Sequence, residues 1–141
     1  MNIKLDETDK EILKQLQTDG RKSYRQIAKE LDLSVGTITN RIQKLQNNKI
    51  IKGFQLELDY QKLGYNIETI IELEAKESID NLLKQYPNNI ITALKTTGKY
   101  DMLLITRFKD TTELNTFLKK INQEENVKKT NTRLILDNIG T

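Results

Sequence analysis

Residues 23–47, SYRQIAKELDLSVGTITNRIQKLQN, restrict the fold of this chain more than any other segment. Ser23 and Ser34 stand where helix N-caps are expected, and Gln26 completes a capping box with Ser23. Asp32 occupies the turn between the two predicted helices, at a position where the backbone is often left-handed. Two short helices joined by a three-residue turn are typical of a helix-turn-helix.

A further helix is predicted before this segment. It begins at Asp6, where acids in the first turn interact favourably with the helix dipole, and it ends at Asp19-Gly20. The apolar residues of the first two helices are predicted to face inward: Ile12, Leu13, Leu16, Ile27, Ala28 and Leu31. In the last helix, apolar residues recur every three or four positions, which predicts a buried stripe of Val35, Ile38, Ile42 and Leu45.

The opposite face of the last helix is polar, as a DNA-reading helix requires. At about 100° per residue, this outward stripe consists of Gly36, Thr37, Asn40, Lys44 and Asn47. The small residues Ser34, Gly36 and Thr37 allow close approach to base edges. Asn40 has the groups to read adenine, and Arg41 on the flank has those to read guanine or hold a phosphate. An ordinary amphipathic helix with a polar outer face is the alternative for each residue.

The distribution of charge supports a polyanion-binding surface on this segment. Residues 20–52 contain eight bases and two acids, whereas residues 54–141 contain 12 bases and 13 acids, within a formal net charge of +3. Lys and Arg near phosphates release counterions and so favour nucleic-acid binding. The bases predicted to contact DNA outside the last helix are Arg21, Lys22 and Arg25. A solvated face without a ligand is the alternative reading of the same charges.

Composition argues against an enzyme and against a metal site. The chain contains no His and no Cys, so the commonest general base, the thiol nucleophile and the usual transition-metal ligands are missing. It has no Gly-x-x-x-x-Gly-Lys phosphate loop. Without a run of about 18 apolar residues, or an apolar segment near the N-terminus, we expect no membrane span and no secretory signal. We therefore expect a cytoplasmic protein with no catalytic residues and no cofactor.

The second half of the chain repeats one β-α-β pattern twice. The predicted elements are a strand at 65–76, a helix at 78–86, strands at 89–97 and 100–108, a helix at 111–124 and a strand at 127–139. Two such units predict an α+β fold, a ferredoxin-like βαββαβ sandwich with both helices on one face of an antiparallel sheet. Before it, residues 50–59 alternate apolar and polar around Phe54, Leu56 and Leu58, which predicts an extended strand.

Two of the predicted strands are apolar on both faces. The opposed residues are Met102 and Leu104 against Leu103 and Ile105, and Ile90 and Leu94 against Ile91 and Ala93. A strand that is apolar on both faces is covered on both faces, and the two helices cover only one. We therefore expect a second copy of the chain to cover the other face, in a homodimer held by buried apolar surface.

Four segments, in their order and spacing over the whole chain, resemble the Lrp/AsnC (feast-famine) family of prokaryotic transcription factors: LDETDKEIL, YRQIAKELDLSVGTITNRIQKLQ, IIKGF and TTGKYD. The resemblance implies a helix-turn-helix, a strand linker and a ligand-sensing sandwich, which we assign to residues 1–50, 51–64 and 65–141. It also implies dimers that assemble into tetramers or octamers. An amino-acid effector bound between subunits would then alter assembly or DNA binding.

The resemblance places the effector site at one hairpin: Thr96, Thr97, Gly98, Lys99, Tyr100 and Asp101. In the family, this Gly-x-x-Asp hairpin lies at the effector pocket. Backbone N–H groups near Gly98 suit a carboxylate, and Asp101 suits an ammonium group. Gly98 and Lys99 also suit the two central positions of a type II′ turn, which the hairpin needs with or without a ligand.

The chain departs from the family where the predicted recognition helix ends. The family usually has Gly just before the apolar pair of IIKGF, but here Lys49 stands at that position, preceded by Asn48. Asn is the second choice after Gly for a left-handed C-cap, so we expect the helix to end near Asn48. Lys49 adds a base near the expected DNA backbone.

The sequence therefore predicts a sequence-specific transcriptional regulator that binds double-stranded DNA and responds to a small effector. The resemblance to the family implies that this effector is an amino acid. A constitutive DNA-organising protein of the same fold, without an effector, is the alternative. A third hypothesis is a small-molecule-binding module whose N-terminal helices make only protein contacts.

Overall fold

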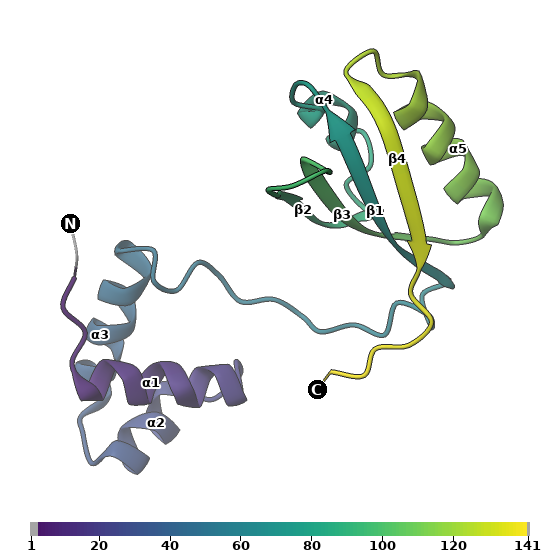
Figure 1. Ribbon diagram of the computed structural model, residues 1–141. Coiled ribbons are helices and arrows are strands. Elements are labelled where there is room, and N and C mark those ends of the chain that lie inside the picture. Colours follow the sequence, from purple (N-terminus) through teal and green to yellow (C-terminus); the bar gives the residue numbers. More distant parts are fainter. Residues whose placement is uncertain (1–2, 141) are drawn as a thin grey trace. The chain divides into compact units, whose positions relative to one another are not determined.

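The computed structural model describes residues 3–140. The chain divides between Glu57 and Leu58 into two compact units, a helical unit and an α+β unit (Figure 1). Among residues 3–140, no helix is long and apolar enough to cross a membrane.

The helical unit consists of α1 (Glu7–Thr18), α2 (Tyr24–Leu31) and α3 (Val35–Asn47). Each helix begins where the sequence predicts, because the side chains of Asp6, Ser23 and Ser34 each accept a hydrogen bond from a backbone N–H in the first turn. Capping boxes reinforce the first two starts. Asp32, between α2 and α3, is left-handed as predicted, with φ 54°.

The core of the helical unit lies where the three helices meet. Its buried residues are Ile12, Leu16, Ile27, Ala28, Ile38, Ile42 and Leu45, and Leu13 and Leu31 pack against them. The predicted stripes are thus confirmed, with one exception. Val35 was expected inside but is 43% exposed, because it is the first residue of α3 and lies one turn before the first buried residue, Ile38.

The end of α3 differs from the prediction at one residue. Asn48 has φ −87°, and it is Lys49 that adopts the left-handed conformation, with φ 57°. The Ile50 N–H donates to the Leu45 carbonyl at 2.9 Å, and the Lys49 N–H donates to the Gln46 carbonyl at 2.9 Å. These two bonds form a Schellman motif. A lysine therefore holds a position that glycine adopts with less strain.

We expect Lys49→Gly to raise the free energy of unfolding by about 0.5–1 kcal/mol. The left-handed conformation costs a residue with a Cβ roughly 1–2 kcal/mol, and the greater chain entropy of glycine in the unfolded state offsets about 0.5–1 kcal/mol of that gain. Thermal unfolding without DNA measures the difference. Lys49→Ala is the control, since it removes the charge and keeps the Cβ; an equal gain for Ala would contradict the explanation.

The predicted linker strand does not form within a single chain. Residues 52–59 pair with no strand among residues 3–140. A strand needs a neighbour for its N–H and C=O groups, and alternation of side chains cannot supply one. The alternating side chains Phe54, Leu56 and Leu58 are 52%, 80% and 44% exposed.

The α+β unit is a four-stranded antiparallel sheet in the order β2-β3-β1-β4, with two helices packed on one face (Figure 1). Its elements are β1 (Ile67–Ala75), α4 (Asp80–Leu83), β2 (Ile90–Lys95), β3 (Met102–Phe108), α5 (Thr111–Gln123) and β4 (Val127–Leu134). This is the ferredoxin-like arrangement, so the predicted fold is confirmed. Phe108 and Phe117 are its largest fully buried side chains.

Every element of the α+β unit is shorter than predicted, and the largest differences are at α4 and β4. The helix expected over 78–86 is cut to one turn, because Ile79 offers no side-chain cap and the chain tightens into i→i+3 hydrogen bonds before Pro87. β4 ends at Leu134 instead of Ile139. Leu134 pairs with Thr69, the Ile135 N–H makes one more bond to the Glu68 carbonyl at 2.9 Å, and β1 itself starts only one residue before Glu68, at Ile67.

A β-bulge in β2 changes which side chains share a face. Ile90 pairs with Thr106 and packs against the core, whereas Leu94, after the bulge, pairs with Leu103 on the other face. The prediction that Ile90 and Leu94 point the same way is therefore wrong. The extra residue shifts the period of two by one position.

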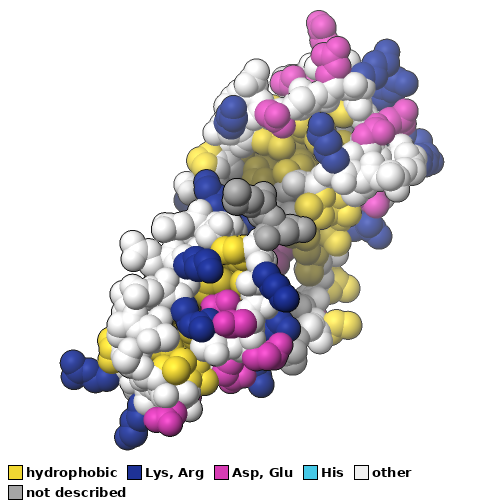
Figure 2. Space-filling model, turned by 90° about the vertical axis from the view of Figure 1, so that its left-hand side faces the viewer, with side chains coloured by type: hydrophobic (Ala, Val, Ile, Leu, Met, Phe, Trp, Pro, Cys, Tyr) yellow, Lys and Arg dark blue, Asp and Glu magenta, His cyan; other side chains and the backbone are white. Residues whose placement is uncertain are grey.

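The face of the sheet away from the helices is uncovered in the single chain. Its central apolar residues are Ile70, Leu94, Leu103 and Ile105. Charged side chains stand beside them, including Glu72 and Arg133, whose oxygen and nitrogen lie 3.1 Å apart. Figure 2 views this unit from the side away from α5 and shows apolar side chains gathered there with charged ones around them.

Candidate functional site

The exposed face of α3 carries the predicted DNA-contacting residues. Gly36, Asn40 and Lys44 on this face are exposed. Ser34 and Thr37 shape the start of the helix, because the Ser34 Oγ accepts the Thr37 N–H at 3.0 Å and lies 2.8 Å from the Thr37 hydroxyl. Val35, which the sequence pattern placed inside, adds exposed methyl groups of the kind that contact thymine.

Arg41, predicted to contact a base or a phosphate, is held by two carboxylates at the start of α1. Its Nη1 donates to both carboxylate oxygens of Asp6, at 2.6 and 2.8 Å, and to Asp9 at 3.0 Å. Asp6 is also the N-cap of α1, so one carboxylate joins the beginning of α1 to the middle of α3. The depression around this group, of about 380 Å³, is lined by Lys4, Asp6, Asp9, Thr37, Asn40, Arg41 and Lys44.

The hydrogen bond from Arg41, together with that from the Asp9 N–H, lowers the pKa of Asp6 to about 2. A carboxyl group whose pKa is lower in the folded state contributes stability above its unfolded pKa, about 3.9, and loses it as the pH falls. We therefore expect the wild-type Tm to fall relative to that of Asp6→Asn between about pH 4 and pH 2. Thermal unfolding of both proteins across this window measures the difference, and a constant gap would contradict the ion pair.

The remaining predicted bases lie in and just before α2. Arg21 and Arg25 are exposed, whereas the Lys22 Nζ lies 2.6 Å from the carboxylate of Glu30. Figure 2 shows Lys and Arg side chains standing among acidic ones on the viewed face of the helical unit. Lys22 and Arg41 thus form ion pairs with acidic residues of the helical unit. Arg21, Arg25 and Lys44 are exposed to solvent.

The hairpin between β2 and β3 has a longer loop than predicted. The Thr96 N–H donates to the Asp101 carbonyl at 2.9 Å, so residues 97–100 form the loop and the expected two-residue turn is wrong. The Thr96 hydroxyl donates to the Tyr100 carbonyl at 2.7 Å, and this hydrogen bond closes the loop a second time. Gly98 has φ 102°, a conformation that favours glycine.

Asp101 anchors this hairpin to β1. Its Oδ2 accepts the Ala75 N–H at 3.1 Å, and its own N–H donates to the Leu73 carbonyl at 2.8 Å. A depression of about 310 Å³ beside it is lined by Ala75, Lys76, Glu77, Ser78, Lys95, Thr96, Asp101 and Met102. Of the predicted effector residues, Thr96 and Asp101 line this depression, and Thr97, Gly98, Lys99 and Tyr100 do not.

The sequence analysis did not predict three charged residues that line this depression: Lys76, Glu77 and Lys95. Lys76 and Glu77 follow the end of β1, and Lys95 ends β2. No local pattern marks them, because only the antiparallel pairing of β1 with β3 and of β3 with β2 brings them beside Asp101.

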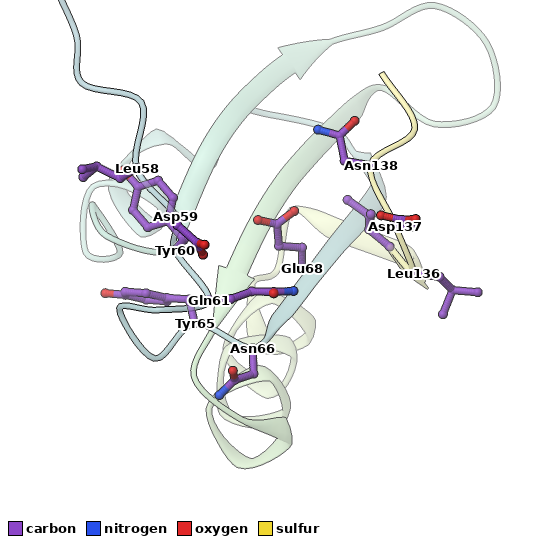
Figure 3. Close-up of a pocket in the computed structure, with 11 residues that line it drawn as sticks. Leu58, Asp59, Tyr60, Gln61, Tyr65, Asn66, Glu68, Leu136, Asp137 and Asn138 are labelled. Atoms are coloured by element: carbon purple, nitrogen blue, oxygen red, sulfur yellow. The ribbon is translucent and has the colours of Figure 1, made fainter. Parts of the chain in front are cut away.

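A second depression, of about 460 Å³, lies at the other end of the sheet (Figure 3) and contains none of the predicted site residues. Its lining consists of Leu58, Asp59, Tyr60, Gln61, Tyr65, Asn66, Glu68, Ile135, Leu136, Asp137 and Asn138. Tyr60 is fixed by the guanidinium of Arg107, 3.3 Å from its ring centroid. Among residues 3–140, no group of three or more acidic side chains is placed to hold a metal ion.

Comparison with known proteins finds two family matches. Residues 5–52 match the winged helix-turn-helix DNA-binding family, and residues 70–140 match the Lrp/AsnC ligand binding domain. The HTH-type transcriptional regulator FL11 of Pyrococcus horikoshii is 40% identical over 141 residues, which cover 96% of this chain and 92% of that protein. The HTH-type transcriptional regulator Ptr1 of Methanocaldococcus jannaschii is 37% identical over 118 residues, 81% of this chain and 79% of that protein.

Solved structures of the same fold span nearly the whole chain. AsnC of E. coli superimposes with a TM-score of 0.85 at 25% identity, covering 99% of this chain and 97% of that one. LrpC of B. subtilis gives 0.81 at 29% identity, with 99% of both chains covered. A transcriptional regulator of Neisseria meningitidis, solved as a complex with L-Met, has a TM-score of 0.88 at 21% identity over 98% of this chain and 94% of that one.

Proposed function

The chain belongs to the Lrp/AsnC family of transcriptional regulators, and on that premise we propose that it binds a specific operator as a homodimer and that an amino acid modulates this binding. The observation that carries the proposal is the exposed polar face of α3, with Asn40 and Lys44 beside the small residue Gly36. In a helix-turn-helix, the second helix lies in the major groove, where base edges carry a unique pattern of donors and acceptors, and α3 holds that place here.

The uncovered sheet face supports a homodimer. Ile70 and Ile105 pair directly across β1 and β3, with Leu94 and Leu103 beside them. A second copy covers such a face with its own identical face, as in the isologous contacts of two-fold dimers. A two-fold dimer presents two copies of α3 to successive major grooves, about 34 Å apart on one side of the DNA.

The depression beside the β2–β3 hairpin supports an amino-acid effector. Lys76 and Lys95 offer positive charge to a carboxylate, and Glu77 and Asp101 offer negative charge to an ammonium group. The Asp101 carboxylate already accepts the Ala75 N–H, so its substitution would also disturb the hairpin. Substitution of Glu77 is therefore the better test of effector binding. The Neisseria relative of the same fold was solved with L-Met.

Binding to duplex DNA tests the first part of the proposal. We expect purified protein to retain a duplex from its own promoter region in preference to a scrambled duplex, with an affinity that falls steeply as salt is raised. Equal affinity for both duplexes would contradict an operator-specific regulator and would support the alternative, a constitutive DNA-organising protein. Absence of binding in dilute buffer would refute DNA binding altogether.

A thermal-shift scan across the twenty amino acids tests the effector. We expect one or a few of them to raise the Tm, because a ligand that binds only the folded state stabilises it, by about 2.7 kcal/mol at 100 times its Kd. Glu77→Gln should abolish that shift, and Glu125→Gln, an exposed change of the same chemistry, should retain it. A flat scan of the wild type would refute the amino-acid effector.

A further inference from the structure

We propose that Arg41 serves DNA binding as a positioning residue, which ties α1 to α3 and neutralises Asp6 and Asp9, while Lys4 and Lys44 contact the phosphates at this edge of the helical unit. This inference rests on the proposed function, namely DNA binding through α3. It replaces the expectation from the sequence that Arg41 reads guanine or holds a phosphate itself.

The geometry at Arg41 supports a role inside the protein. Its Nη1 donates to both oxygens of Asp6 and to one oxygen of Asp9. The Asp6 Oδ1 that receives Arg41 also accepts the Asp9 N–H at 2.8 Å, so the helix cap and the ion pair hold each other in place. The fork formed by Nη1 and Nη2 is therefore not available for a bidentate contact with guanine, because Nη1 is already engaged by the two carboxylates.

The charges around Arg41 explain why DNA binding needs it. Asp6 and Asp9 line the same depression as Asn40 and Lys44, which face the predicted DNA. Without Arg41, two uncompensated carboxylates would stand beside the phosphates and repel them. With Arg41 in place, the exposed Lys4 and Lys44 make the lining net positive.

Salt titration of DNA affinity separates this role from direct contact. The proteins to compare are the wild type, Arg41→Ala, Lys44→Ala and the triple variant Arg41→Ala/Asp6→Asn/Asp9→Asn, on the promoter duplex and its scrambled counterpart. Asn keeps the capping interactions while it removes the charge. Circular dichroism and the Tm of each variant establish that the helical unit is folded at the assay temperature.

We expect Lys44→Ala to lower the slope of log K against log salt by about 0.9, the value for one lost phosphate contact. Arg41→Ala should lower affinity for both duplexes alike, by about three- to tenfold at low salt, and this loss should shrink as salt screens the two uncompensated carboxylates. The triple variant should recover most of this loss. As a control, Arg41→Ala/Glu7→Gln/Glu11→Gln makes the same change in charge elsewhere on α1 and should recover little.

The proposal is overturned if the variant Arg41→Ala/Asp6→Asn/Asp9→Asn keeps a salt slope about one unit lower than that of the wild type, as a lost phosphate contact would cause, or if Arg41→Ala weakens only the promoter duplex. Equal recovery in the two triple variants would also overturn it, because net charge alone would then explain the loss. A wild type that binds no duplex at all is a different result, since it refutes the proposed function before Arg41 is tested.

Discussion

Ile105→Lys is expected to turn the proposed homodimer into monomers and to lower affinity for a duplex with two half-sites by about 10²- to 10⁴-fold, the range in which linking two binding modules raises avidity. Ile105 lies in the middle of β3, opposite Ile70 in β1 and Thr92 in β2, on the face without helices. In a two-fold dimer the new ammonium group would be buried, and would also meet its own copy near the axis.

Light scattering and binding to duplexes with one and two half-sites measure this effect together. The monomer should bind a single half-site about as well as the wild-type protein does, because α3 is untouched. Asn115→Lys is the control, since it adds the same charge at an exposed position of α5. An Ile105→Lys protein that remains dimeric would refute the sheet face as the dimer contact.

Phe117→Ala is expected to cost the α+β unit about 3–5 kcal/mol of its free energy of unfolding. The Phe117 side chain is fully buried on α5, with ring centroids of Tyr86 at 4.8 Å and Phe108 at 5.2 Å. Truncation removes the contacts that join α5 to the segment after α4 and to β3, and it leaves a cavity that these rigid elements cannot close. Small domains have a total free energy of unfolding of about 5–15 kcal/mol, so this substitution would remove a large part of it.

Urea unfolding followed by near-ultraviolet circular dichroism measures this loss. Lys119→Ala, an exposed change two residues further along α5, should alter stability by less than about 0.5 kcal/mol. A Phe117→Ala protein as stable as this control would contradict the central place of Phe117 in the core.

Local sequence patterns predicted the helical unit nearly to the residue. Asp6, Ser23 and Ser34 act within one turn of their own helix, so the cap and the residues that it satisfies lie next to each other in the chain. The predictions were wrong at the two ends of α3, where packing and the helix cap decide the conformation of single residues. Val35 precedes the first full turn that packs on its neighbours, and Lys49 took the left-handed position that the pattern left to Asn48.

The candidate sites depended on residues far apart in sequence, and there prediction was weaker. Arg41 meets carboxylates 35 and 32 residues away, a pairing that no helical period indicates. Lys76 and Glu77 come beside Asp101 only through strand pairing. The length of β4 was likewise decided by where β1 starts, and not by the apolar residues that follow Leu134.

The three helices, their caps and the ferredoxin-like order of the second unit could be predicted from local patterns, because they follow from hydrogen bonds within a turn and from the 3.6- and two-residue periods of apolar side chains. The folded chain was needed to establish which charges are paired, where the strands end and on which face of the sheet Leu94 lies after the bulge. Those features depend on the partner that each group finds across the fold, and an unpaired charge, strand edge or shifted register looks the same in the sequence as a paired one.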